Sequence, residues 1–99
     1  MFVTSGVTHS PRAYWGAYSV SKTALEMLAN TYAAENAKTY PQLKINLIDP
    51  GIVRTAMRAQ AMPGENPMAR SAPEEITEIF VRLADTQFDE TGKKYYCYP

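Results

Sequence analysis

The stretch Ala17-Tyr18-Ser19-Val20-Ser21-Lys22-Thr23-Ala24 opens a helical pattern that continues to about Asn36. Apolar residues recur along it every three or four positions, which is typical of a helix with one buried stripe. That stripe consists of Leu25, Leu28, Ala29, Tyr32 and Ala33. Met27 and Ala34 widen the apolar surface, so the helix either packs on a sheet and a second partner or carries a few exposed methyl groups.

Tyr18 and Lys22 lie four residues apart, and therefore they share one face of this helix. Ser5 precedes Tyr18 by thirteen residues, across a loop marked by Gly6 and Gly16. A nearby ammonium favours the phenolate form of a phenol, and a phenol tuned in this way can exchange a proton with a substrate oxygen. A neighbouring serine hydroxyl can hold that oxygen. The three side chains are our candidate catalytic group.

Short apolar segments flank the helix and predict a parallel sheet. Phe2 to Thr4 resemble the end of a strand, and Leu43 to Ile48 form an apolar segment suited to a strand covered on both faces. A strand–helix–strand order with so long a connection predicts a right-handed parallel unit. Ser5 follows the first strand and Asp49-Pro50-Gly51 follows the second, so we expect both at the carboxyl edge of one α/β sheet, where ligands bind.

Three sequence words together resemble the short-chain dehydrogenase/reductase family. They are Val3-Thr4-Ser5-Gly6, Ala17 to Ala24, and Asp49-Pro50-Gly51-Ile52-Val53-Arg54-Thr55. The resemblance implies that residues 1–99 form one partial domain, the C-terminal portion of a Rossmann-like doubly wound parallel sheet. It also implies hydride transfer between a nicotinamide and a carbonyl/alcohol pair. The catalytic residues it implies are Ser5, Tyr18 and Lys22.

The same resemblance implies a nicotinamide site in the turn after the second strand. Pro50 and Gly51 would cradle the ring, the backbone of Ile52 would meet the carboxamide, and the hydroxyl of Thr55 would reach the cofactor. Tyr18 and Lys22 would also contact the cofactor, with Lys22 on the nicotinamide ribose. The residues alone leave Thr55 open as a plain helix N-cap, and they do not separate NAD from NADP.

The segment from Thr55 onward predicts short elements joined by a loop. We expect a short helix over Thr55 to Met62, then a loop that its Pro, Gly and Met content predicts to be mobile. Ser71 should cap a further helix, and the last strand should lie within Lys93 to Tyr98. The expected buried face of that helix is Ile76, Ile79, Phe80 and Leu83.

The composition excludes several classes of function. Ten basic and ten acidic residues cancel, which gives no electrostatic case for binding nucleic acid or an anionic membrane. A single histidine argues against a histidine-rich metal site, and a single cysteine excludes an intrachain disulfide. No apolar run is long enough for a bilayer, so the cytoplasm is the expected compartment.

Two features leave an alternative open. The five glycines do not form the glycine-rich loop that binds a dinucleotide, and no acidic residue takes the place of the one that selects the ribose hydroxyl. The chain could therefore be an oxidoreductase segment that works with a complementing N-terminal half. It could instead be a truncated, non-catalytic interaction module that forms a homo-oligomer through its long helix. The substrate, beyond a small carbonyl compound or alcohol, stays undefined.

Overall fold

A computed structural model describes all 99 residues and contains one three-stranded parallel sheet. Its strands, in spatial order, are β1 (Phe2–Val3), β2 (Leu47–Asp49) and β3 (Lys94–Tyr96). Its α-helices are α1 (Gly16–Asn36), α2 (Ala56–Ala61) and α3 (Thr77–Ala84). Three single turns of 3₁₀ helix complete the chain, η1 (Gly6–Thr8), η2 (Pro67–Ala69) and η3 (Pro73–Ile76).

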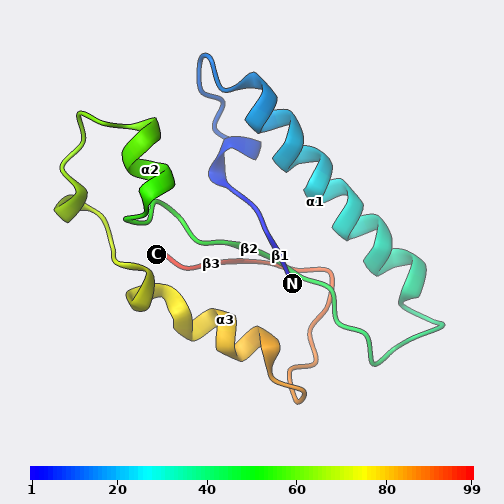
Figure 1. Cartoon of the computed structure of the whole chain (residues 1–99). Coiled ribbons are helices and arrows are strands. Elements are labelled where there is room, and N and C mark those ends of the chain that lie inside the picture. The colour runs from blue at the N-terminus through cyan, green and yellow to red at the C-terminus, as the bar shows by residue number, and fades with distance from the viewer.

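The strands and helices have the arrangement that a parallel α/β unit requires. Figure 1 shows α1 and α3 on opposite sides of the strands, with α1 connecting β1 to β2. In the register of the sheet, Phe2 lies beside Leu47, and Leu47 lies beside Lys94. All three strands run in the same direction, so their carboxyl ends share one edge. The predicted parallel sheet is confirmed, and Ser5 and Pro50 lie at that edge.

The strand expected over residues 43–48 is shorter than predicted and is displaced toward its carboxyl end. Leu43 is exposed, whereas residues 45–49 are all buried. Before β2 begins, side chains supplement the backbone hydrogen bonds: Ile45 N donates to Thr91 Oγ1, and Asn46 Nδ2 donates to the carbonyl of Glu90. The sequence pattern found the buried segment but could not show that polar side chains anchor its first half.

Two other predicted boundaries are corrected. Ser71 does not cap a helix; it forms an isolated parallel bridge with Val53, and its carbonyl accepts the amide of Arg54. The helical region that follows begins as the 3₁₀ turn η3. Its N-cap residue, Ala72, has no polar side-chain atom that could accept a hydrogen bond from the turn. The last strand covers only Lys94–Tyr96 of the predicted 93–98. The face expected to be buried is only half-buried, with Ile79, Phe80 and Leu83 on α3 and Ile76 at the end of η3.

Helix α1 buries little of its apolar stripe. Ala29 and Ala33 are buried in the core with Ile45 and Leu47, but Leu28 of the same stripe is 60% exposed. The outward side of α1 is more open still. Its exposed large side chains are Val20, Met27, Leu28 and Tyr32. No helix of the chain has both the length and the apolar character needed to cross a bilayer.

The chain is less compact than an ordinary domain of the same length. Its radius of gyration is 15.1 Å, compared with about 13 Å for an ordinary 100-residue domain. Its accessible surface is 6947 Å², whereas roughly 5,700 Å² is expected for a folded monomer of this mass. Only ten of the 99 residues are buried. The excess surface, roughly 1,300 Å², is comparable to the area that a protein interface buries.

A polar network beneath the sheet edge connects α1 to the strands. Lys94 Nζ donates to Glu26 Oε1 at 3.0 Å, and Thr4 Oγ1 donates to Glu26 Oε2 at 3.1 Å. Lys94 also donates to Thr8 Oγ1 at 3.3 Å. Desolvation alone would raise the pKa of Glu26, but the hydrogen bonds from Thr8, Lys94 and Thr4 lower it below its ordinary value. This network fixes α1 relative to β1 and β3.

Glu26→Gln should lower the free energy of unfolding at pH 7 by about 1–3 kcal/mol, because Lys94 loses its charged partner. The pKa of Glu26 is lowered on folding, so its contribution is complete above 4.5 and is lost as the pH falls through the lower folded value. Urea unfolding of both proteins should therefore converge in acid. Glu35→Gln, an exposed glutamate of the same helix, is the control, and an equal loss in both variants would contradict the proposed network.

Candidate functional site

All seven residues singled out by the sequence line one cavity of about 270 Å³ at the carboxyl edge of the strands. They are Ser5, Tyr18, Lys22, Pro50, Gly51, Ile52 and Thr55. They come from the segment after β1, from the start of α1, and from the turn between β2 and α2. The fold therefore brings together every predicted site residue, while the roles assigned to them stay predictions.

Tyr18 is held by its neighbours through its ring and its backbone. Its ring packs edge-on against Trp15, with ring centroids 5.9 Å apart at 88°. Its carbonyl accepts the hydroxyl of Ser21 at 2.7 Å. Tyr18 lines the 270 Å³ cavity, and its hydroxyl forms no hydrogen bond within the chain.

Lys22 lies one turn further along α1, on the side of the helix that faces β1. Its Nζ donates to the carbonyl of Val3 at 3.1 Å and lies 5.8 Å from the centre of the Tyr18 ring. An ammonium has three hydrogens to donate, and this bond uses one of them. The strand end thus fixes the lysine beside Tyr18 while leaving two donors for a ligand.

Ser5 lies where the chain leaves β1 and turns into η1. Its Oγ is the N-cap acceptor of that turn, at 3.5 Å from the amide of Val7, and its carbonyl accepts the hydroxyl of Thr8. A contact of 3.5 Å is a weak hydrogen bond. The serine hydroxyl can therefore still donate to a substrate oxygen, as the sequence analysis expects.

The turn after β2 requires glycine at residue 51. Gly51 has φ of 76°, and a Cβ built there would lie 2.7 Å from Cδ1 of Tyr98. Asp49, which is 1% exposed, fixes this turn: Oδ1 accepts the amide of Gly51 at 2.9 Å, and Oδ2 accepts the hydroxyl of Tyr98 at 2.7 Å. Burial and the bond to Asp49 raise the pKa of Tyr98 to about 12. Tyr98 therefore stays protonated near neutral pH.

Beyond Gly51, the backbone and a hydroxyl face the cavity. The amides of Ile52 and Val53 form no hydrogen bond within the chain, whereas those of Gly51 before them and Arg54 after them do. Thr55 caps α2, because its Oγ1 accepts the amide of Arg58 at 3.1 Å. A hydroxyl that accepts one bond can still donate another. The cap and the predicted cofactor contact of Thr55 are thus compatible.

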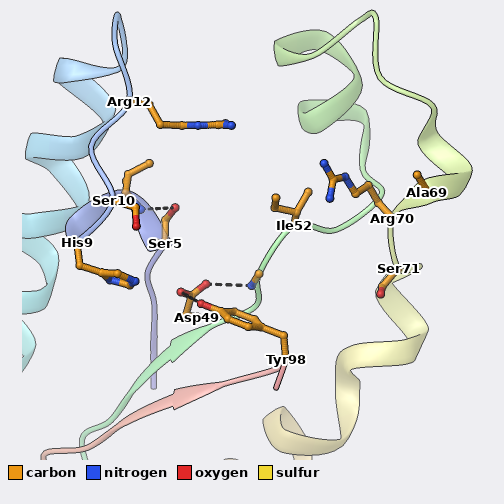
Figure 2. Close-up of a pocket in the computed structure, with 13 residues that line it drawn as sticks. Ser5, His9, Ser10, Arg12, Asp49, Ile52, Ala69, Arg70, Ser71 and Tyr98 are labelled. Atoms are coloured by element: carbon orange, nitrogen blue, oxygen red, sulfur yellow. Dashed lines mark hydrogen bonds between the residues drawn. The ribbon is translucent and has the colours of Figure 1, made fainter.

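A second, larger cavity of about 510 Å³ adjoins the first and shares Ser5, Gly51 and Ile52 with it. Figure 2 shows Asp49 and Tyr98 at its base, Ser10 and Arg12 on one wall, and Arg70 on the other. Sequence reasoning assigned no role to this group. Asp49 was noted only as the start of a turn, and its partner Tyr98 lies 49 residues further along the chain.

The loop after α2 is held by an ion cluster that the sequence analysis also missed. Glu65 pairs with Arg58 at 2.7 Å and with Arg70 at 2.9 Å. The hydrogen bonds from Arg58 and then Arg70 lower the pKa of Glu65 to about 2. A segment that its composition predicts to be mobile is thus attached to α2 at Arg58. The opposite charges themselves were the only signal in the sequence, and their spacing fits no regular element.

Comparison with known families gives a match over the first two thirds of the chain. Residues 1–66 match the model of the short chain dehydrogenases. The chain is 37% identical over 100 residues to an uncharacterized oxidoreductase, YciK, of Escherichia coli K12, which covers all of this chain and 38% of that protein.

Solved structures agree with this match. The chain superposes on a short chain dehydrogenase from Shigella flexneri 2a, complexed with NADP, with a TM-score of 0.87 and 36% identity over 99% of this chain and 40% of that one. For a short chain dehydrogenase from Pseudomonas syringae the values are 0.86 and 38%, over 97% and 39%. The chain spans about two fifths of the length of these relatives. The expected fold, a portion of a Rossmann-like parallel sheet, is confirmed.

Gly51→Ala should destabilise the turn by about 1–2 kcal/mol, because a residue with a Cβ is strained at this positive φ. The added methyl group would also displace the ring of Tyr98 from Asp49. The pKa of Tyr98, followed by ultraviolet titration, should then fall from about 12 toward 10. Gly64→Ala is the control, since nothing lies within 4 Å of its added Cβ. An unchanged Tyr98 titration in Gly51→Ala would contradict this account.

Proposed function

Because the chain belongs to the short-chain dehydrogenase family, we propose that it supplies the catalytic edge of an NAD(P)-dependent oxidoreductase. The reaction is the interconversion of a carbonyl compound and an alcohol. The observation that carries this proposal is the convergence of Ser5, Tyr18 and Lys22 on one cavity with the turn after β2. When bound, the nicotinamide cofactor supplies or accepts the hydride.

The three side chains take distinct roles. Tyr18 is the general acid or base, and its unpartnered hydroxyl gives a proton to the substrate oxygen or takes one from it. Lys22 places a positive charge 5.8 Å from the centre of the Tyr18 ring, beside the group that exchanges the proton. Ser5 donates a hydrogen bond to the same substrate oxygen and orients it. All three groups face one cavity, so a single small molecule could contact them together.

The cavity also fits a nicotinamide. Gly51 lets the backbone come close to a flat ring, and the free amide of Ile52 is a donor for a carboxamide oxygen. Pro50 stiffens the turn, and Thr55 offers a hydroxyl hydrogen at its far side. Lys22 keeps two donors for ribose hydroxyls. NADP is the first cofactor to test, because it is named with the Shigella relative, and NAD is the second.

Tyr18→Phe should reduce carbonyl reduction by roughly a hundred- to ten-thousand-fold, the usual effect of losing a positioned acid. The assay follows NADPH oxidation by the chain together with a glycine-rich dinucleotide-binding half, supplied as a separate or fused polypeptide. Tyr14→Phe is the matched control, because Tyr14 is fully exposed and lines neither cavity. Equal rates in the two variants would remove Tyr18 from the mechanism.

The open surface supports a second element of the proposal, which is association. The outward face of α1 exposes Val20, Met27 and Leu28, and β1 has no strand on its outer side. An unpaired strand edge carries free donors and acceptors. The partner is either a second copy of the chain or a complementing glycine-rich half. A non-catalytic interaction module would use the same helix surface, so loss of association alone does not decide between enzyme and module.

Val20→Glu should weaken association, because a charge on the α1 face would have to be buried without a partner. Val81→Glu on α3 is a closely matched control: Val20 is 70% exposed and Val81 is 69% exposed, so both variants should fold. Light scattering over a concentration series should show a smaller mass for Val20→Glu than for Val81→Glu. The same mass in both variants would exclude the α1 face as the interface.

A further inference from the structure

The 510 Å³ cavity has the size of a small-molecule site, and charged side chains are among the residues that line it. Only four of its 13 lining residues are hydrophobic. It opens directly from the hydroxyl of Ser5, where a substrate oxygen is proposed to lie. What else this cavity can hold is decided by its charged groups, which are Arg12, Arg70 and Asp49, together with the imidazole of His9.

Arg12 is the least committed of these groups. It forms no ion pair, and its guanidinium lies 4.8 Å from the centre of the Trp15 ring. A cation on an aromatic face is held in orientation while its N–H groups stay free at the edge. In Figure 2 the guanidinium of Arg12 extends into the hollow from the wall that carries Ser5 and Ser10.

Arg70 extends into the same hollow from the opposite wall, toward Arg12 (Figure 2). It is paired with Glu65, but Glu65 is shared with Arg58, so the cluster of three keeps one net positive charge. Glu65 itself does not line the cavity. The walls of the cavity therefore carry positive charge on both sides.

The one carboxylate in the lining keeps its negative charge, but it is a single charge against two positive ones, that of Arg12 and the net charge of the Glu65 cluster. Asp49 is 1% exposed, and both of its oxygens already accept hydrogen bonds, one from Gly51 and one from Tyr98. Two guanidinium groups with free donors face each other above the carboxylate of Asp49, whose oxygens already accept hydrogen bonds. This arrangement favours an anion between the two guanidinium groups. Guanidinium groups bind carboxylate and phosphate oxygens through paired hydrogen bonds.

We infer that the substrate is itself an anion: a carbonyl compound or alcohol whose carboxylate or phosphate lies between Arg12 and Arg70 while its reacting oxygen lies at Ser5. This inference rests on the proposed function, since it uses Ser5 to place the reacting end. It adds a class of substrate, because a neutral ketone or alcohol would leave Arg12 without an ionic partner and the positive charge of the cavity unbalanced. Ser10 and His9, on the Arg12 side of the cavity, provide further donors for the same anion.

The chain contains its own reporter for this site. Trp15 is the only tryptophan, and it lies against Arg12. An anion that binds Arg12 should therefore change the fluorescence of Trp15. The probes are levulinate, a 4-oxo carboxylate, and methyl levulinate, which has the same ketone but no charge. Levulinate should bind at least roughly tenfold more tightly than the ester, as expected for a charge-assisted hydrogen bond.

Arg12→Gln should abolish this preference, and Arg12→Lys should keep part of it, because a lysine retains the charge but not the paired geometry. Arg82→Gln is the charge-matched control, since Arg82 lies on α3 outside the cavity, and it should leave the preference unchanged. Equal binding of acid and ester would overturn the inference, as would a preference that survives in Arg12→Gln. Competition of nicotinamide mononucleotide with levulinate would also overturn it, by assigning the arginines to the cofactor.

The titration involves no hydride transfer, so its outcome is independent of the Tyr18 assay. Failure of the levulinate preference with an active Tyr18 would leave an oxidoreductase for neutral substrates. A levulinate preference without Tyr18-dependent turnover would leave an anion site and refute the enzymatic role.

Discussion

The carboxylate of Asp49 determines the geometry of both cavities. It is buried at the end of the central strand and accepts hydrogen bonds from Gly51 in the next turn and from Tyr98 near the other end of the chain. A buried carboxylate without such partners would be costly, so the turn and the tyrosine are held together. The positions of the Ile52 amide and of the cavity wall that it forms with Gly51 depend on the carboxylate of Asp49.

Local patterns in the sequence were sufficient for the catalytic candidates. Tyr18 and Lys22 converge because a helix repeats every 3.6 residues, and Ser5 meets them because parallel strands end at the same edge. Gly51 was expected to allow a close approach of the backbone, and its φ of 76° adds a second reason for a glycine there. Near neighbours in sequence and one rule of sheet topology predicted that these residues converge, while their roles came from the resemblance to the short-chain dehydrogenase/reductase family.

The interactions that the sequence could not predict join residues far apart in the chain. Glu26 and Lys94 are 68 residues apart, and nothing in the local sequence of either one indicates the other. The strand expected at Leu43 begins at Leu47, because Thr91 and Glu90 provide side-chain and carbonyl partners there. Ser71 had the sequence of a helix cap, but the neighbouring Val53 segment forms a bridge with it instead. In each case a tertiary contact overrides a local preference.

The small buried core has a thermodynamic consequence. The slope of unfolding free energy against denaturant and the heat capacity of unfolding both scale with the area that unfolding exposes. With ten residues buried and an excess of accessible surface, this chain has less area to expose than an ordinary domain of 99 residues. Its unfolding by itself should therefore be gradual. If a partner covers the α1 face and the outer edge of β1, as proposed above, unfolding of the assembled protein should expose more area. Its unfolding transition should then be sharper than that of the chain alone.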